Sequence, residues 1–265
     1  MVLGWDEERP KERNYNDFVR NLISGLTELG QQGVSLMLYG SYVRGDTNIG
    51  RSDIDAILIF PDDVIIDKPR LNIASNALAT ALNGNNVPFQ VTLADLTTMR
   101  EGTFNPFEPN FKGYFKKEGK IVLGQDYRNS FIYSLPIHSD QTNIRFNLRK
   151  SRLGLLFFEH LKSKDYRELL NRFNKTLDAV SRASKQIPGM IDGELRASRF
   201  SALEVLPKLF PELDISSLYR IRSLYHNLEE LDDLYRNQSE LEKVWKESVT
   251  FFESLVKSYL EMRTK

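Results

Sequence analysis

Short apolar runs and helical apolar periodicity alternate in the first third of the chain. Apolar residues recur at helical spacing in Tyr15–Leu29, and Asn72–Leu82 is rich in Ala and Leu, so both segments are predicted helices. Val34–Tyr39, Ile54–Phe60 and Pro88–Leu93 are short and bounded by Gly, Pro, Asn or Asp, which predicts strands. This order of elements predicts a small mixed sheet covered by helices.

The pattern changes beyond Pro136, where glycines become sparse and helical periodicity is almost unbroken. Helices are expected near residues 144–162, 165–186, 192–206, 214–236 and 239–262. The predicted breaks lie at Ser163-Lys164, Pro188-Gly189, Pro207 and Pro211. The expected fold class is therefore α+β, with a small mixed-sheet domain at residues 1–130 and an all-α helical bundle at residues 131–265.

Composition narrows the class of protein. Lys plus Arg and Asp plus Glu number 36 each, so no overall charge draws the chain to nucleic acid or membrane. The chain has no Cys, which excludes disulfides, thiolate metal sites and a cysteine nucleophile. No apolar run approaches the roughly 18 residues of a membrane span, and the first residues lack an apolar signal core. We expect a cytoplasmic protein without a membrane partner.

Polar residues that could bind a metal ion or phosphate lie where the predicted strands end and begin. Gly40-Ser41 follows the first strand, and Asp53 and Asp55 lie at the start of the second. Because side chains alternate along a strand, the two carboxylates point to one face, with α-carbons about 6.5–7 Å apart. Such a pair suits Mg²⁺, which is usually held by one or two carboxylates plus substrate phosphates. The Gly-Ser turn offers close backbone approach and donors to those phosphates.

The motif Gly40-Ser41-x-x-Arg44-Gly45, followed by Ser52-Asp53-Ile54-Asp55, resembles the nucleotidyltransferase superfamily that includes DNA polymerase β. Among its members, it is most similar to the minimal nucleotidyltransferases and the aminoglycoside adenylyltransferases. The resemblance implies that Gly40 and Ser41 hold nucleotide phosphates and that Asp53 and Asp55 bind Mg²⁺. Arg44 and Ser52 are further candidates for binding the nucleotide.

One member of the implied site is replaced. In the resembling family a third carboxylate lies on a neighbouring strand, at the position that aligns with Gln90. Glutamine keeps an oxygen ligand but carries no negative charge and cannot act as a base. Three alternatives follow. Asp95 or Glu101 substitutes from a shifted position; another group or a homodimer partner serves, or the acceptor needs no strong base; or the chain binds nucleotide with little turnover.

The predicted helical bundle adds two candidate sites. Arg145, Arg149 and Arg152 share one helix face, and Arg149 is a candidate for binding the β- and γ-phosphates, although a solvated basic face is the alternative. Arg220 and His226 fit the R-x5-H pattern of the HEPN helical ribonucleases, where a structural histidine is the alternative.

The expected function is Mg²⁺-dependent transfer of a nucleoside monophosphate, AMP by default, from a nucleoside triphosphate to a hydroxyl. ATP is the expected donor, and the acceptor is a small molecule, a protein or an RNA. Two alternatives stay open: a catalytically weak nucleotide sensor or antitoxin-like partner, motivated by Gln90, and a ribonuclease of the helical domain.

Overall fold

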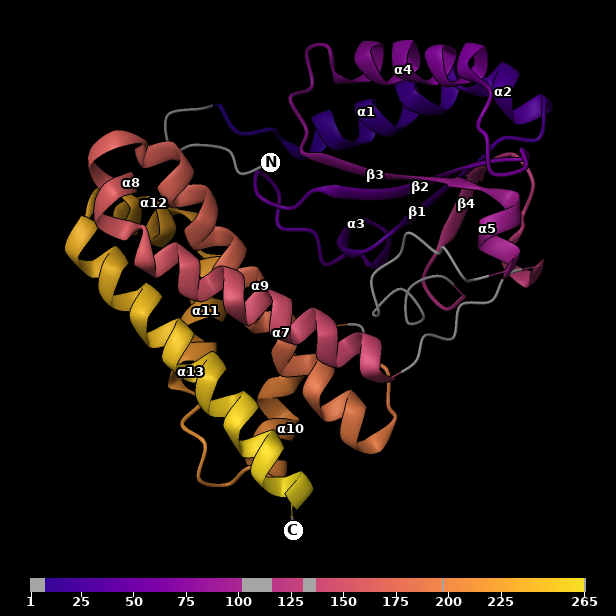
Figure 1. Cartoon of the computed structure of the whole chain (residues 1–265). Helices are drawn as coiled ribbons and strands as arrows, with labels where there is room; N and C mark the ends of the chain where they lie inside the picture. The colour runs from indigo at the N-terminus through magenta and orange to yellow at the C-terminus, as the bar shows by residue number, and fades with distance from the viewer. Residues whose placement is uncertain (1–7, 102–115, 131–136, 197, 265) are drawn as a thin grey trace. The chain divides into compact units, whose positions relative to one another are not determined.

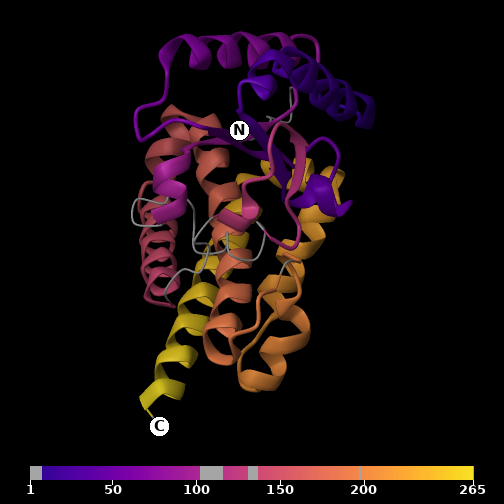
Figure 2. The same cartoon turned by 90° about the vertical axis from the view of Figure 1, so that its right-hand side faces the viewer.

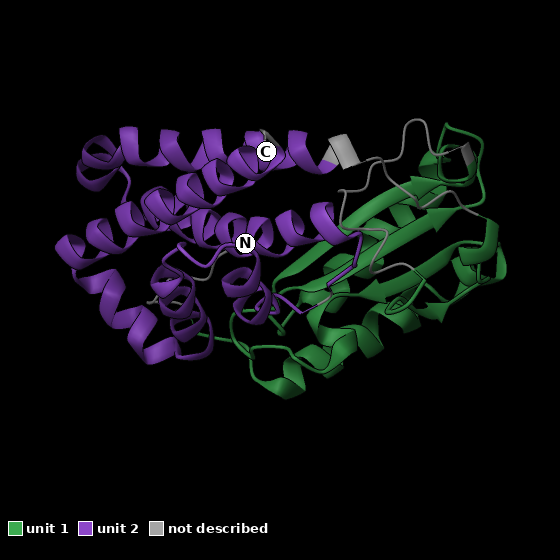
Figure 3. Ribbon diagram, turned by 90° about the horizontal axis from the view of Figure 1, so that it is seen from below, with its two compact units in different colours: residues 1–135 green, residues 136–265 purple. Residues whose placement is uncertain are grey.

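The computed structural model describes residues 8–101, 116–130, 137–196 and 198–264 (Figure 1). The chain divides into two compact units, Met1–Leu135 and Pro136–Lys265 (Figure 3). Each unit has its own apolar core. Sequence patterning places the boundary after residue 130, and residues 131–136 lie outside the described ranges. The α+β class, a small mixed sheet followed by helices, is confirmed.

Four strands form one sheet in the first unit. They are β1 (Ser35–Tyr39), β2 (Ile54–Phe60), β3 (Phe89–Asp95) and β4 (Lys120–Leu123), in the order β3-β2-β1-β4. β1 is antiparallel to both β2 and β4, whereas β2 and β3 are parallel. The three predicted strands are therefore confirmed within one or two residues at each end.

Two helices cover one face of this sheet, as Figures 1 and 2 both show: α1 (Glu12–Gly25) and α4 (Lys68–Leu82). The predicted helix Tyr15–Leu29 is in fact two, because α1 ends at Gly25 and a short helix, α2 (Thr27–Gln31), follows. A Cβ on Gly25 would lie 2.8 Å from the Cβ of Ala77, so glycine lets α1 approach α4 closely. The core between helices and sheet includes Phe18, Leu22, Leu36, Leu38, Ile54, Ala56, Leu58, Phe60, Ala77 and Ala81.

The other face of the sheet has a smaller apolar cover. Met37, Ile57 and Ile59 pack there with Met99 from α5 (Leu96–Glu101) and with Tyr127, which precedes the 3-10 helix η1 (Arg128–Ser130). Asp55 lies on this same face, one side-chain alternation before Ile57. The described apolar cluster thus covers one end of this face, and the Asp55 carboxylate lies toward the other end.

All regular elements among the described residues of the second unit are helices. Its helices are α7 (Ile137–Leu156), α8 (Phe158–Lys164), α9 (Tyr166–Asp192), α10 (Ala202–Leu209), α11 (Ser216–His226), α12 (Leu228–Arg236) and α13 (Gln238–Thr264). The long helices α7, α9 and α13 contact one another around Phe173, Trp245 and Phe252, which are fully buried. Of the helices that the structure describes, none combines the length and apolarity needed to cross a membrane.

Two predicted helix breaks are wrong. Pro188 lies buried inside α9, which ends at Asp192 with Gly193 in the left-handed conformation as its C-cap. Pro207 likewise lies inside α10. A proline near the end of a helix removes only one late backbone hydrogen bond. Burial of the Pro188 ring offsets part of that loss, whereas Pro207 is exposed. The predicted helix 192–206 is also wrong, because α9 ends at Asp192 and α10 begins only at Ala202.

Candidate functional site

The turn after β1 is built on two glycines with positive φ. Gly40 has φ 76° and ψ −157°, a conformation almost restricted to glycine, and it precedes the four-residue helix α3 (Ser41–Arg44). Gly45 closes the turn in the left-handed conformation, with φ 78° and ψ 16°. Hydrogen bonds from the backbone N–H of Arg44 to the Gly40 carbonyl, 3.2 Å, and from that of Asp46 to the Ser41 carbonyl, 3.1 Å, hold it together.

The carboxylate of Asp55 lies directly against this turn. A Cβ built on Gly40 would stand 2.2 Å from Asp55 Oδ2 and 3.1 Å from its Cγ. Only a residue without a side chain can therefore occupy position 40 while Asp55 keeps this place. Asp53 directly precedes β2 and, like Asp55, is partly buried, whereas Ile54 between them is fully buried in the core. The predicted alternation of faces is thus observed.

Gln90 lies beside Asp55 on the neighbouring strand. The parallel register of β2 and β3 pairs Asp55 with Gln90, and the antiparallel register of β1 and β2 pairs Asp55 with Tyr39. Gln90 is exposed, so a bound molecule can reach its amide. The position that the family resemblance assigns to the third carboxylate is therefore adjacent to Asp55 and holds a neutral side chain.

Asp95, one of the two acids considered as replacements, is far from this position. Asp95 lies five residues further along β3, a separation of roughly 16 Å at the rise of a strand. It accepts hydrogen bonds from the Thr98 backbone N–H (2.8 Å), the Thr98 hydroxyl (2.6 Å) and the Val64 N–H (3.2 Å). Burial alone would raise the Asp95 pKa, but these bonds outweigh it and the pKa is lowered. Glu101 ends α5 beyond Asp95, and its side chain is outside the described residues.

A buried tyrosine fixes the loop that presents Asp53. The Tyr15 hydroxyl, on α1, donates to the Ser52 carbonyl at 2.7 Å and accepts from the Gly50 N–H at 3.2 Å. Ser52 is buried, and its own hydroxyl accepts from the Asn48 N–H at 3.0 Å. These contacts give Ser52 a place in the loop framework; its contact with nucleotide stays a prediction. Tyr15 was missed by sequence reasoning, because its apolar spacing signals only a core helix position.

The two predicted arginines differ in their surroundings. Arg44 is bonded to the carboxylates of Glu118 and Asp46, at 3.0 and 3.2 Å. Arg149 is exposed on α7 in the second unit, near Arg152, which pairs with Glu253 at 2.6 Å. The binding of nucleotide by Arg149 therefore stays a prediction.

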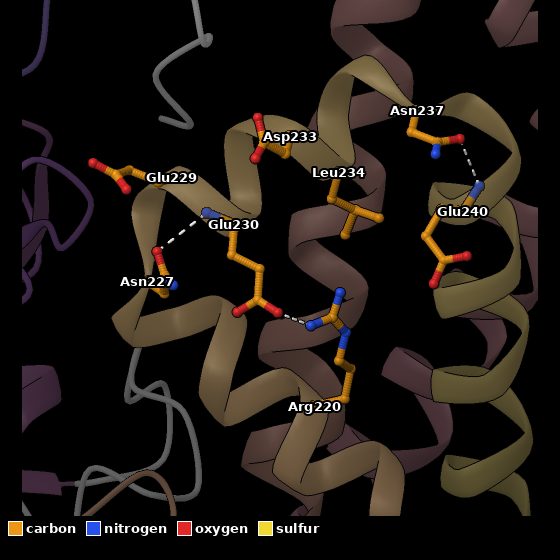
Figure 4. A pocket seen from close by; sticks show the side chains of 8 residues that line it. All are labelled: Arg220, Asn227, Glu229, Glu230, Asp233, Leu234, Asn237 and Glu240. Carbon is orange, nitrogen blue, oxygen red and sulfur yellow. Dashed lines mark hydrogen bonds and ion pairs between the residues drawn. The ribbon is translucent and has the colours of Figure 1, made fainter.

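Arg220 and His226 lie on α11, and Arg220 borders a hollow of about 360 Å³ (Figure 4). Arg220 is ion-paired with Glu230, which also accepts a hydrogen bond from Ser223 at 2.6 Å. The other charged residues that line the hollow are Glu229, Asp233 and Glu240. The lining has an excess of carboxylates and does not include His226, so this hollow gives no support to the ribonuclease alternative.

The donor set at Asp53 and Asp55 suits a magnesium ion shared with a substrate. Among the described residues, no three His, Asp or Glu side chains gather closely enough to form a protein-only metal site. Two carboxylates beside a glycine turn leave room for phosphate oxygens to complete the shell, which is the usual way in which Mg²⁺ is held.

Comparisons with known proteins agree with this geometry. Residues 19–122 match the family model described as the nucleotidyltransferase domain, a range that includes both aspartates, the glycine turn and Gln90. The chain is also similar to the crystal structure of a spectinomycin adenyltransferase from Enterococcus faecialis with ATP and spectinomycin. That match has 11% identity and a TM-score of 0.51, and it covers 91% of this chain and 98% of the other. At this identity the likeness shows a shared fold.

A sequence search of curated proteins finds no match. The domain match lies in the first unit, and the shared fold extends over both units. The expected superfamily is thereby confirmed. Together, the domain match at residues 19–122 and the shared fold support a nucleotidyltransferase superfamily assignment and, with it, a transferase enzyme.

Proposed function

We propose that this protein transfers a nucleoside monophosphate, AMP by default, from a nucleoside triphosphate to a hydroxyl group in a Mg²⁺-dependent reaction. One observation carries the proposal: the Asp55 carboxylate lies against the backbone of Gly40. A cation bound by the carboxylate and a phosphate bound at the Gly40-Ser41 turn are therefore neighbours. This is the arrangement that phosphoryl chemistry requires.

Each residue has a distinct role in this proposal. Asp53 and Asp55 would hold Mg²⁺, which would supply neutralisation of charge on the attacking and leaving oxygens. The Gly40-Ser41 turn binds phosphate oxygens through N–H and hydroxyl donors. The acceptor hydroxyl attacks the α-phosphorus, the bond to pyrophosphate breaks, and the hydroxyl proton is released. Gln90 can orient the acceptor but cannot take this proton, so water or another group receives it.

The donor and acceptor follow from chemistry and from the similar structure. The spectinomycin adenyltransferase was crystallised with ATP and spectinomycin, which supports ATP as donor and a small hydroxylated molecule as acceptor. A protein side chain or an RNA end is the alternative acceptor. A search with labelled triphosphate over these three acceptor classes distinguishes them.

A second candidate function is nucleotide sensing without turnover, motivated by the neutral Gln90 beside Asp55. It differs from the first in one observable: the protein would bind a triphosphate and Mg²⁺ but release no pyrophosphate with any acceptor.

The direct test uses the four nucleoside triphosphates, each labelled at the α-phosphate, with Mg²⁺ and a panel of hydroxylated small molecules, proteins and RNAs. We expect label transfer from ATP with stoichiometric pyrophosphate release, and loss of both when EDTA removes the metal. Transfer that is unchanged in EDTA would contradict the metal assignment. Tight ATP binding without any pyrophosphate would favour the sensor instead.

Gln90→Glu should increase the rate of transfer. The change restores a carboxylate beside Asp55, adding negative charge for metal binding and a base for the acceptor proton. We expect a gain of roughly 10-fold or more, at the lower end of what general base catalysis supplies. The gain should grow with pH until the new carboxylate is fully ionised. A rate lower than that of the unchanged protein at saturating Mg²⁺ would show that position 90 is not the third-acid position.

Tyr15→Phe should lower both stability and activity. Removing the hydroxyl leaves the buried Ser52 carbonyl and Gly50 N–H without this partner, at a cost of about 1–3 kcal/mol in the free energy of unfolding. The loosened loop should also reduce kcat, because Asp53 directly follows Ser52. Tyr127→Phe is a matched control, since its hydroxyl donates to the Gly33 carbonyl at 2.9 Å, before the far end of β1. It should lower stability alone, so equal losses of kcat in the two variants would contradict the role of Tyr15.

A further inference from the structure

Arg44 is held by two carboxylates within the first unit. Its Nη1 donates to Glu118 Oε2 at 3.0 Å, and its Nε lies 3.2 Å from Asp46 Oδ1. The side chains of Arg44 and Glu118 are only 21% and 11% exposed, whereas that of Asp46 is 48% exposed. The contact with Glu118 is therefore the more shielded of the two, and the less screened by solvent.

The strand pairing explains how residues 74 positions apart meet. Leu38 on β1 pairs with Lys120 on β4 in antiparallel register. Continued by two residues, this register brings Glu118 level with Gly40, where the Gly40–Gly45 turn begins. The Arg44–Glu118 bond thus links α3, the helical part of that turn, to the chain that enters β4.

The local charge argues against a phosphate ligand. One guanidinium faces two carboxylates, so the group of three has a net charge of −1 and does not attract a triphosphate by its field. Burial alone would lower the Arg44 pKa, but the hydrogen bonds and charges of Glu118 and Asp46 outweigh it and the pKa is raised. The guanidinium is therefore cationic and is engaged by protein carboxylates.

We infer that Arg44 and Glu118 are a pair of positioning residues, which fix the Gly40–Gly45 turn against the entry to β4 so that its donors face the nucleotide phosphates. The inference rests on the proposed function for the phosphates, and it assigns Arg44 a different role from direct phosphate binding. Neither residue touches the reacting atoms. Both act through the placement of Gly40 and Ser41.

The test compares Arg44→Gln, Glu118→Gln and the double variant in steady-state transfer. Both single variants should lower kcat/KM by roughly 10- to 100-fold, as displacement of a binding group by about an ångström does. The kcat/KM of the double variant should be no lower than that of the less active single variant, because both single changes remove the same contact. A direct phosphate ligand shielded by Glu118 predicts opposite signs: Glu118→Gln would lower the KM for triphosphate and Arg44→Gln would raise it. That result would overturn the inference.

A second measurement separates this inference from the proposed function, because it needs no nucleotide. The Asp46 amide donates to the Ser41 carbonyl and closes the turn, so its hydrogen exchange reports on the turn itself. Exchange should become faster in both single variants and stay unchanged in Lys117→Gln, an exposed neighbour of Glu118. Unchanged exchange in Glu118→Gln would overturn the inference even if transfer is observed. Failure of label transfer in the unchanged protein would instead overturn the proposed function. The exchanged pair Arg44→Glu with Glu118→Arg, which should recover part of the activity, guards against variants that fail to fold.

Discussion

Asp53→Asn and Asp55→Asn will each reduce nucleotidyl transfer by roughly 100- to 1000-fold, the range observed when one preorganised electrostatic group is removed from an active site. Asparagine has nearly the shape of aspartate but lacks the charge that binds Mg²⁺. The structure gives a reason to expect intact folding, since both residues are partly buried at the start of β2 while the core residues beside them are unchanged. The measurement is α-label transfer at saturating ATP and Mg²⁺.

Thermal unfolding without metal provides a check on folding, because a Tm close to that of the unchanged protein shows that lost activity is not lost structure. The extra stabilisation by Mg²⁺ with nucleotide should disappear. Asp63→Asn is the matched control, because Asp63 is exposed beyond the other end of β2. Full activity in both site variants would contradict the metal assignment.

Gly40→Ala has the second largest expected effect. Its φ of 76° and ψ of −157° cost a side chain about 1–3 kcal/mol. In addition, the new Cβ would lie 2.2 Å from Asp55 Oδ2, so the carboxylate or the turn must move. Because the proposed metal and phosphate positions meet there, transfer should fall by at least roughly 100-fold.

Gly84→Ala separates the two causes. Gly84 also has a positive φ of 77°, but nothing lies within 4 Å of a Cβ built there. It should lower the free energy of unfolding by about 1–2 kcal/mol, the cost of the left-handed conformation, and leave transfer per folded molecule unchanged. Thermal unfolding and label transfer, measured on both variants, check this. If Gly40→Ala behaves like Gly84→Ala, the close approach of Asp55 to the turn is not functional.

The strands and the site pair were predictable because their signals are local. The run Ile54–Phe60 has the observed bounds of β2, and the alternation of side chains places Asp53 and Asp55 away from the buried Ile54. The glycines of the turn were visible for the same reason: only glycine adopts the conformation of Gly40 readily. Local conformational preference and period-two burial were sufficient here.

The supporting contacts were not predictable because they join distant segments. The Tyr15 hydroxyl reaches the loop of Gly50 and Ser52, and Arg44 reaches Glu118, through a fold that no local pattern encodes. The predicted helix ends in the second unit were partly wrong for a related reason. The buried Pro188 continues α9, where local preference predicts a break, since packing in the core outweighs one missing hydrogen bond.

The most direct test of the central claim is a crystal structure with Mn²⁺ and a non-hydrolysable ATP analogue. Manganese is located by its anomalous scattering and accepts the same oxygen ligands as magnesium. The account predicts Mn²⁺ within about 2.2 Å of carboxylate oxygens from both Asp53 and Asp55 and of a phosphate oxygen, with the phosphates against Gly40 and Ser41. A metal–triphosphate complex bound elsewhere, touching neither aspartate, would contradict it.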